Sequence, residues 1–416
     1  MDKKCFAVTG PFVPANEPMT LLSYKYLRAL DLPVEVVALE LMKDPSLEEK
    51  LAKDPKFSNF HINYVGKYHD ALFSIKNVNL FKALYFMHRY VKKAIKAYDD
   101  QEIIFTSSFP AYVHRVGLAI KNAHPDVTWV ASFSDPINNS PYKNDLRTYK
   151  EYSLIEKIAF KTYCKFYVDD QDEIIALENA DLLIFICEEQ RDFMIQQYLK
   201  DHNKLSQSDL LAKAVIFPLN YIEEWDDIIK TRQVPNQKFT LAHFGRVYGL
   251  RDATVFIQAV NDLVKNNLLS KDIIIKQFGE FRKSDCLLIK ELGLEAYFDI
   301  YDKIPYEKCI DEMNKADVLL IFDTIVANDE IQPYLPSKVL EYSLLKKDTL
   351  TITCKNSPCY RIAKESNAIV ALNEKEDIKI ALLKAIDGVS SVLNYDYTND
   401  KAKTALKNML IKKGIL

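Results

Sequence analysis

Short β-branched runs alternate with helix-length amphipathic segments along nearly the whole chain, and few folds accommodate that alternation. It is typical of parallel βαβ units, in which a helix follows each strand and covers the sheet. In the first half the pattern predicts strands at residues 5–9, 34–39, 102–106, 127–132, 181–187 and 214–217. Helices are expected between most of these strands, among them residues 18–30, 80–98 and 189–199.

The second half repeats the alternation more regularly and predicts a complete doubly wound sheet of its own. Its strands are expected at residues 239–244, 273–278, 298–304, 318–322, 349–353 and 369–372. A polar segment, residues 220–238, separates the halves and predicts a linker. A length of 416 residues agrees with two domains, expected at 1–219 and 239–390. A helical segment at 391–416 is expected to pack back on the first domain.

Composition excludes several classes of protein. The formal net charge of -3 argues against bulk nucleic-acid binding. No run of about 18 apolar residues is present, and the opening MDKKCFAVTG does not resemble a signal peptide. The seven cysteines are odd in number and irregularly spaced, which indicates reduced thiols in a cytoplasmic protein.

Ligands of open α/β sheets bind at the carboxyl ends of the strands, so the loops that follow strands are the place to look for a site. The chain holds nine glycines and no GxGxxG fingerprint, which removes the main support for a nicotinamide oxidoreductase. Two other loops contain suitable chemistry.

The first loop runs from His243 to Arg251 after an apolar strand. Gly245 allows a ligand to approach the backbone closely, and Arg246 and Arg251 have the geometry to clamp a diphosphate. The alternative is an ordinary strand-to-helix turn with two solvated arginines.

The second is the segment QPYLPSKVLEY, residues 332–342. Ser337 is placed to cap a helix whose N-terminal N–H groups suit a phosphate, and Lys338 adds positive charge. Glu341 lies one turn further on, where a carboxylate can accept hydrogen bonds from a ribose. The alternative is a well-capped helix with an exposed lysine and glutamate.

In chain order, these segments resemble the GT-B glycosyltransferases, specifically the GT4-like group (glycosyl transferases group 1). The resemblance covers roughly residues 5–390 and rests on TGPFVPANEP, SDP at 134–136, NADLLIFICEEQRDFMI, VIFPLNY, FGRVYGLR and LPSKVLEY. It implies an α/β protein of GT-B architecture, with two Rossmann-like doubly wound parallel-sheet domains facing each other across a cleft.

The resemblance also implies roles for individual residues. Arg246 and Arg251 would hold the diphosphate of the donor, with Arg251 in place of the family's usual lysine. Glu341 would bind its ribose. The rest of the predicted donor-binding set is Gly245, Ile304, Ser337 and Lys338, and Asp135 would lie near the transferred sugar and count with the two arginines as catalytic.

One position departs from the family's E-x7-E motif. The first glutamate would fall at residue 333, where this chain has Pro333, and how the sugar is held is left open. Asp329 or Glu330 is a candidate substitute. Asp135 has an equal alternative as the first residue of a turn before Pro136.

The function implied is transfer of a sugar, with retention, from a nucleoside diphosphate sugar to a saccharide or lipid-linked saccharide acceptor in bacterial polysaccharide or glycoconjugate biosynthesis. No metal or other cofactor is expected. Two other functions stay open: a catalytically degenerate GT-B module that serves as a scaffold, which Pro333 favours, and a nucleotide-sugar epimerase.

Residues 80–98, from Leu80 to Tyr98, predict an amphipathic helix. Its basic face predicts peripheral attachment to anionic lipid at the inner face of a membrane, and the alternative is a core-packed helix with a solvated basic face. The predicted apolar face is Leu80, Leu84, Met87, Val91, Ala94, Ile95 and Tyr98, and the basic face is Lys82, Arg89, Lys93 and Lys96.

Overall fold

The computed structural model describes residues 3–67, 80–108, 110–144, 153–154, 158, 170–225, 238–269, 272–327, 329–395, 397–412 and 414, with only the backbone described for 80–84, 143–144, 170 and 405. The chain separates into two compact units. The first comprises Met1–Asn144, Glu151–Trp225 and Tyr397–Leu416, and the second comprises Asp145–Lys150 and Asp226–Asp396. Most of the predicted linker, residues 226–237, lies outside the described residues.

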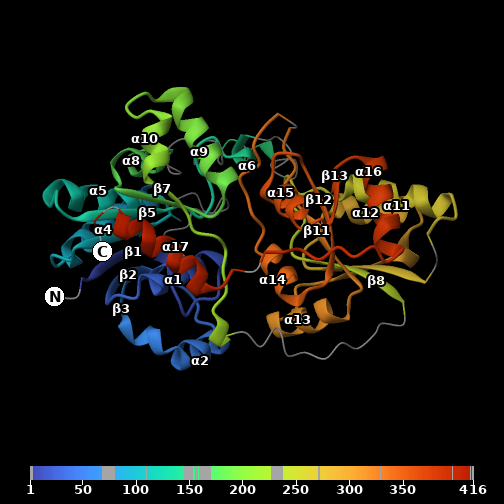
Figure 1. The fold of residues 1–416 in the computed structure, drawn as a ribbon, viewed down its shortest axis with the longest axis horizontal. Coiled ribbons are helices and arrows are strands. Elements are labelled where there is room, and N and C mark those ends of the chain that lie inside the picture. The colour runs from blue at the N-terminus through green and yellow to red at the C-terminus, as the bar shows by residue number, and fades with distance from the viewer. Residues whose placement is uncertain are drawn as a thin grey trace. The chain divides into compact units, whose positions relative to one another are not determined.

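The first unit contains a seven-stranded parallel sheet in the order β3-β2-β1-β4-β5-β6-β7 (Figure 1). All six predicted strands of this half are present, and β3 is an additional one. The sequence pattern missed β3 because it is an edge strand that stays partly exposed along its length. The strands are β1 (Cys5–Pro11), β2 (Val34–Glu40), β3 (Phe60–Lys67), β4 (Ile103–Ser107), β5 (Thr128–Ser132), β6 (Leu182–Phe185) and β7 (Ala214–Ile216).

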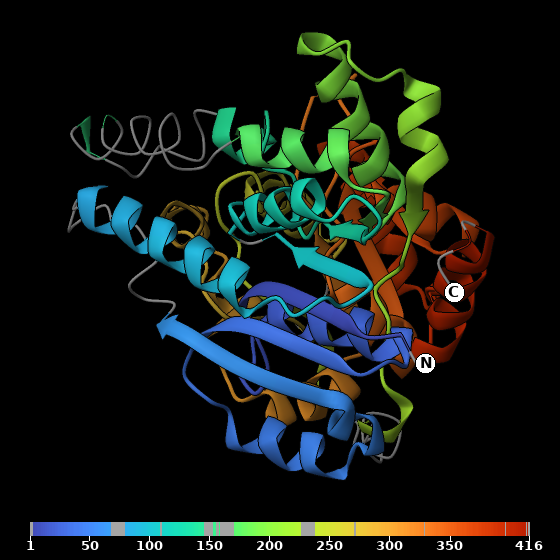
Figure 2. The same ribbon diagram turned by 90° about the vertical axis from the view of Figure 1, so that its left-hand side faces the viewer.

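Helices cover both faces of this sheet, as right-handed crossovers require (Figure 2). Helix α1 packs against α17, whereas α5 packs against both α4 and α8. The helices of the unit are α1 (Pro18–Leu30), α2 (Pro45–Lys53), η1 (Pro55–Asn59), α4 (Leu80–Ala97), α5 (Val113–Ala123), α6 (Pro141–Asn144), α8 (Asp170–Asn179), α9 (Glu188–Asp201), α10 (Gln207–Lys213), η3 (Glu223–Trp225) and α17 (Asn399–Lys412).

Helix α17, near the C-terminal end of the sequence, is joined to α1 by a buried polar cluster centred on Arg28. The guanidinium pairs with Asp54, with 2.7 Å between Nε and Oδ2, and donates to Asn399 Oδ1 at 3.2 Å. The Arg28 and Asp54 side chains are 2% and 0% exposed. Asp54 also accepts from the Tyr24 hydroxyl at 2.8 Å, and the Tyr24 ring stacks on Trp225. The cluster therefore unites segments that lie far apart in the sequence.

The second unit contains a six-stranded parallel sheet in the order β10-β9-β8-β11-β12-β13. Four strands have the predicted bounds, and a fifth begins one residue earlier. The strands are β8 (Phe239–Phe244), β9 (Ile273–Phe278), β10 (Phe298–Tyr301), β11 (Val318–Phe322), β12 (Asp348–Thr353) and β13 (Ile369–Leu372). The helices are α11 (Thr254–Lys265), α12 (Lys283–Glu291), η5 (Glu295–Tyr297), α13 (Tyr306–Lys315), α14 (Lys338–Leu345), α15 (Pro358–Glu365) and α16 (Lys375–Ile386).

The prediction that the third strand of this unit extends to Ile304 is wrong. Strand β10 is an edge strand whose only neighbour is β9, and the pairing ends at Tyr301, opposite Phe278. Beyond Phe278 the backbone turns away at Gly279, where φ is 115°. Ile304 consequently lies in the loop before α13.

The central strands of each sheet are buried on both faces, so they read as continuous apolar runs. In the second unit α11 and α16 pack against each other and close one face over a core that includes Phe256, Ile257 and Leu382. Helices α13, α14 and α15 contact β8, β11 and β12. The loops at the carboxyl ends of the strands are thereby set on a rigid base. Among the helices of the described residues, none is long and apolar enough to span a bilayer.

Candidate functional site

The loops after β8 and β9 pack against each other at the carboxyl edge of the second sheet. Gly245 N–H donates to Phe278 O, and Val247 N–H donates to Glu280 O, both at 2.9 Å. A Cβ atom at Gly279 would lie 2.7 Å from Gly245 O, so only glycine permits this approach. Gly245 itself has a φ of 145°. The glycine predicted to admit a ligand therefore also joins two loops.

Beneath these loops lies a buried pair, His243 and Gln277. His243 Nδ1 is 2.8 Å from Gln277 Oε1, and Gln277 Nε2 donates to Gly245 O at 2.8 Å. Burial lowers the pKa of His243 to about 3, and the charges of Arg251 and Lys338 lower it further against the opposing effect of Gln277. The imidazole is neutral at physiological pH, with two cations near it.

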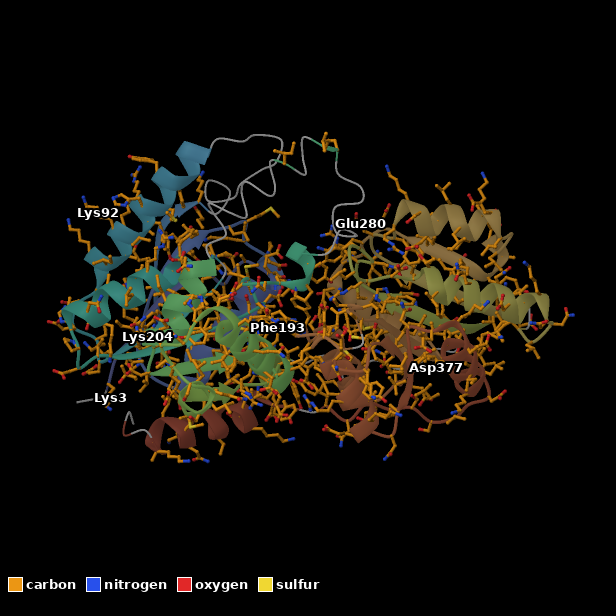
Figure 3. The ribbon with its side chains drawn as sticks, turned by 90° about the horizontal axis from the view of Figure 1, so that it is seen from above. Lys3, Lys92, Phe193, Lys204, Glu280 and Asp377 are labelled. Carbon is orange, nitrogen blue, oxygen red and sulfur yellow. The ribbon has the colours of Figure 1, made fainter. Side chains whose placement is uncertain are left out.

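Arg246 lies at the surface in an ion pair with Glu280. Its Nε and Nη2 are 2.7 and 2.6 Å from Glu280 Oε2, and the two side chains are 64% and 61% exposed. Figure 3 labels Glu280 on the second unit. The Arg246 guanidinium also lies 5.1 Å from the centre of the Tyr248 ring. A phosphate that binds Arg246 must compete with this carboxylate.

Arg251 lies between the ends of β8 and β11. It forms an isolated antiparallel bridge with Thr324, and its guanidinium is 5.8 Å from the centre of the same Tyr248 ring. Its charge lowers the pKa of His243 and opposes the burial that raises the pKa of Asp323. Tyr248 therefore links the two arginines of the predicted diphosphate loop.

A buried carboxylate, Asp323, anchors the segment that leads to α14. Its oxygens accept from Gln332 Nε2 at 2.6 Å and from Thr353 Oγ1 at 2.7 Å. Thr353 Oγ1 is 2.6 Å from Ser357 Oγ, and Gln332 N–H donates to Asn356 O at 2.9 Å. Burial raises the pKa of Asp323, and the hydrogen bonds from the Thr353 hydroxyl and the Thr324 N–H partly offset this rise. The loops after β11 and β12 are thus fixed to each other.

Ser337 precedes α14 as predicted, but its side chain does not cap the helix. Its backbone is helical, with φ of −58° and ψ of −25°, whereas a capping residue needs an extended backbone to turn its hydroxyl back. The N–H groups of Val339 and Leu340 instead donate to Pro336 O and Ser337 O, both at 3.1 Å. Within the described residues the N–H groups of Ser337 and Lys338 have no acceptor, which leaves them for an anion.

Lys338 and Glu341 form an ion pair across the first turn of α14. Lys338 Nζ also lies 5.9 Å from the centre of the Tyr306 ring at the start of α13. Ile304 O accepts a weak hydrogen bond from Cys309 Sγ at 3.7 Å. Burial raises the pKa of Cys309, and Lys338 and Glu341 act on it with opposite signs. Ile304 therefore lies near the same turn of α14.

The predicted donor-binding residues of the second unit form one connected set. Arg251 and Lys338 both act on His243, and Arg246 and Arg251 share Tyr248. Gly245 adjoins them through Gln277, Glu341 through its ion pair with Lys338, and Ser337 as the residue before Lys338, whereas Ile304 is hydrogen-bonded, within the described part of the chain, only to Cys309 of α13.

Asp135 belongs to the first unit and is exposed in the loop after β5. Buried Glu173 fixes this loop by accepting from Ile137 N–H at 2.9 Å and Asn138 N–H at 2.8 Å. Gln190 Nε2 donates to Ser134 O at 2.9 Å. Asp135 is thus an exposed carboxylate on a rigid turn, which fits both readings of it.

Pro333 is buried, and Asp329 and Glu330, the candidate substitutes for the missing glutamate, are exposed. The neighbouring Gln332 is the polar residue that the structure turns inward, toward Asp323.

Several residues that shape the site were not singled out from the sequence. Asp323 had a visible signal, since it is the polar residue that directly follows the apolar run VLLIF. Gln277 lies inside an apolar strand, where a polar side chain demands a partner. Arg282 pairs with Asp285, three residues further on, at 2.7 Å and with Asp252 at 2.5 Å; the bond to Asp252 had no local signal because it is set by tertiary packing.

Among the described residues, no group of three or more His, Cys, Asp or Glu side chains is arranged to hold a metal ion. The triplet Asp170-Gln171-Asp172 has the DxD spacing often associated with metals but lies within helix α8. Asp172 is 2.6 Å from Arg115, so this carboxylate serves an ion pair.

The apolar face predicted for α4 is partly wrong. Tyr90 and Ala94 are buried, while Ile95 is 38% exposed. Residues 87, 90, 91 and 94 form the stripe toward the sheet, which leaves Ile95 at its margin. Tyr90 can be buried because its hydroxyl donates to Thr9 O at 2.5 Å. The side chains of Leu80, Lys82 and Leu84 lie outside the described residues.

The exposed face of α4 is basic. Arg89, Lys92, Lys93 and Lys96 are all exposed, and the helix contains no acidic residue. Figure 3 labels Lys92 on this helix. Tyr85 is 67% exposed beside them.

Solved structures resemble the chain over nearly its whole length. Sucrose-phosphate synthase from Thermosynechococcus elongatus has a TM-score of 0.60 at 12% identity, covering 99% of this chain and 98% of that one. Anabaena HepE, solved in complex with UDP and glucose, has a TM-score of 0.57 at 11% identity, covering 98% and 95%. A putative UDP-N-acetylglucosamine 2-epimerase from Listeria monocytogenes has a TM-score of 0.54 at 10% identity, covering 100% and 97%.

No family model matches the sequence, and no curated protein matches it. At identities this low the structural likeness establishes the fold alone. The two parallel α/β units, of seven and six strands, have the GT-B-like architecture that these structures share. This fold occurs in glycosyltransferases and epimerases that use nucleotide sugars.

Proposed function

We propose that the chain is a glycosyltransferase that moves a sugar from a nucleoside diphosphate sugar to a saccharide or lipid-linked saccharide, with retention of configuration, in bacterial polysaccharide or glycoconjugate biosynthesis. One observation carries the proposal: Arg251, in the loop after β8, and Lys338, at the start of α14, both lower the pKa of the buried neutral His243 at the carboxyl edge of one sheet. Two cations gathered at a strand-end site suit a diphosphate. Anabaena HepE, of the same fold, was solved with UDP and glucose.

In this proposal Arg246 and Arg251 bind the diphosphate, and Lys338 with the N–H groups at the start of α14 binds its terminal phosphate. As the bond from the sugar to the diphosphate breaks, negative charge develops on the leaving phosphate. Preorganised cations and N–H dipoles stabilise that charge more than they stabilise the ground state. Glu341 accepts from the ribose hydroxyls, and Gly245 gives the phosphates access to the backbone.

Calorimetric titration with UDP tests these assignments. We expect Arg251→Ala and Glu341→Ala to weaken binding by about tenfold or more each, since each removes a charge-assisted hydrogen bond worth about 1.5–3 kcal/mol. Lys379→Ala is the matched control, because Lys379 lies on α16 in a surface pair with Glu376. An undiminished affinity for UDP in both site variants would contradict the assigned roles.

Two other functions can be distinguished from this one by the reaction products that each would give. Pro333 at the position of the first motif glutamate favours a degenerate module, which would bind UDP without releasing it from a donor. The likeness to the Listeria putative epimerase favours a nucleotide-sugar epimerase, which would convert UDP-N-acetylglucosamine to its epimer with no acceptor. Incubation with a panel of nucleotide sugars, followed by chromatography, distinguishes transfer or hydrolysis, epimerisation and inertness.

Attachment of this cytoplasmic enzyme to anionic lipid through α4 is part of the proposal, because it would bring the enzyme to a lipid-linked acceptor. The four exposed cations of α4, with no acidic residue in the helix, support it. Each basic residue near such a surface contributes about 1 kcal/mol. Co-sedimentation with phosphatidylglycerol vesicles should fall with added salt and with Lys92→Glu/Lys96→Glu. Equal recovery on neutral vesicles would contradict the proposal.

A further inference from the structure

On the basis of the function proposed above, we propose that His243 and Gln277 are positioning residues, which hold the Gly245 peptide in the orientation that receives the donor diphosphate. Neither side chain needs to touch the donor. They act through the backbone of Gly245 and its neighbour Gly279.

The hydrogen bonds of Gln277 fix its orientation and that of His243. Gln277 lies 2.8 Å from Gly245 O and 3.4 Å from Gly279 O, and carbonyl oxygens only accept. The amide nitrogen must therefore face them, and Oε1 must face His243 Nδ1 at 2.8 Å. It follows that His243 carries a proton on Nδ1, and burial, which lowers the pKa of the imidazole to about 3, keeps the other ring nitrogen unprotonated. The network has one consistent arrangement of hydrogens.

The Gly245 peptide is consequently held from both sides. Its N–H is bound to Phe278 O and its carbonyl to Gln277, while Gly279 approaches too closely for any larger residue. Arg246 is the next residue, so the direction in which it leaves the sheet depends on this peptide. A rotation here would move the predicted diphosphate loop as a whole.

Burial is the main cause that keeps the His243 imidazole neutral, and the charges that face it act in the same direction. Arg251 approaches from the loop after β8 and Lys338 from α14, and Asp323 at the end of β11 interacts with Arg251. Phe322 of β11 contributes only a ring, 4.9 Å from the imidazole. An imidazolium here would repel the two cations assigned to the phosphates, whereas the neutral pair supports the loop without a charge of its own.

Gln277→Glu tests the role through pH. A protonated glutamic acid reproduces the two short bonds of the glutamine, because its hydroxyl donates to Gly245 O and its other oxygen accepts from His243; only the long 3.4 Å bond to Gly279 O is lost. The carboxylate cannot donate and would repel the carbonyl. Burial raises the pKa of a glutamate, so the brace should hold at lower pH and be lost as pH rises.

We expect the UDP affinity of Gln277→Glu, as a ratio to that of the unaltered protein at the same pH, to be near one at about pH 5.5 and about tenfold lower at about pH 8. Gln277→Met should be about tenfold weaker at both. Gln190→Glu is the matched control, since Gln190 also donates to a carbonyl, Ser134 O, and accepts from Ile186 N–H. A Gln277→Glu ratio that is the same at both pH values, whether intact or lost, overturns the proposal.

Amide hydrogen exchange separates this inference from the proposed function. In Gln277→Met we expect faster exchange confined to residues 244–252 and 278–281. Unchanged exchange there, or faster exchange throughout the unit, overturns the positioning role. If the unaltered protein binds no UDP, the proposed function fails, and the exchange result still decides whether the brace exists.

Discussion

Replacement of Arg28 by methionine should destabilise the first unit by about 3–5 kcal/mol, the usual cost of breaking a buried ion pair by removing one partner. Methionine retains most of the packing of the arginine stem and removes the charge. It leaves the Asp54 carboxylate, which is 0% exposed, without its cation. The bond from Arg28 to Glu224 adds little to this figure, since the Glu224 side chain is 53% exposed.

Tryptophan fluorescence during urea unfolding reads this unit selectively, because Trp129 and Trp225 are the two tryptophans of the chain and both belong to it. With a urea dependence of about 1–3 kcal/mol/M, the midpoint should fall by about 1–5 M. Lys403→Met is the control at the same helix pair. Its partner Asp31 is 43% exposed at 2.6 Å, so the loss should stay under about 1 kcal/mol.

Arg28→Met/Asp54→Asn sharpens the test. The side-chain amide introduced by Asp54→Asn still accepts from Tyr24 without burying a charge, so the double variant should be more stable than Arg28→Met alone by about 2 kcal/mol. A midpoint for Arg28→Met within about 0.3 M of the unaltered protein would refute the reasoning. So would a double variant that shows the plain sum of the two single effects.

Three further predictions follow from contacts within one unit or the other. Glu280→Gln should strengthen UDP binding by about twofold to fivefold at low salt and less at high salt, because an exposed carboxylate no longer competes for Arg246; weaker binding in calorimetry would contradict this. Gly279→Ala should destabilise the second unit by more than Gly293→Ala when both are compared by urea unfolding followed by circular dichroism. Both glycines have positive φ, but an added Cβ meets Gly245 O at 2.7 Å only in the first and meets nothing within 4 Å in the second; equal losses would show that backbone strain alone matters. His114, whose pKa burial lowers from 6.5 to about 3, binds a proton more readily in the unfolded chain between these values, so stability rises with pH there and is lost as pH falls. His114→Asn should reduce that slope by about 1 kcal/mol per pH unit between about pH 6 and 4 in the fluorescence assay, and an unchanged slope would assign the proton elsewhere.

The strands that were predictable from sequence are those buried on both faces. The runs FTLAHF and VLLIF predict central parallel strands by composition alone, and the strands they form, β8 and β11, have the predicted bounds. Strand β3 was not predicted because an edge strand mixes exposed and half-buried residues. Strand β10 was predicted too long because its end depends on where its neighbour β9 stops. Local pattern identifies a strand, whereas pairing decides its length.

The residues of the candidate site differ in the same way in how far the sequence predicts them. Glycines and cations at strand ends are visible in the sequence because a loop after an apolar run is a local feature. Glu280, the partner of Arg246, follows a different strand, and this pairing becomes apparent only in three dimensions, as does the bond from Gln332 to Asp323 that anchors the loop before α14. Ser337 shows the opposite case, a contact that was predicted from sequence and is absent. Serine often caps a helix, but here its backbone is helical and its hydroxyl does not cap α14.

If the proposed function holds, the arrangement of charge at the carboxyl edge explains how the cations of the site can stay oriented and still release a product. Arg246 is paired with the exposed carboxylate of Glu280 and Lys338 with the half-buried carboxylate of Glu341, while His243 and Gln277 beneath them are held by neutral hydrogen bonds. A surface carboxylate such as that of Glu280 can be replaced by a phosphate at little cost, since an exposed pair is worth about 0–1 kcal/mol. A fully buried carboxylate in its place would bind the cation too firmly to yield it. Neutral hydrogen bonds that hold the loops rigidly, together with a surface ion pair that a phosphate can displace, favour binding that is specific in position and still reversible.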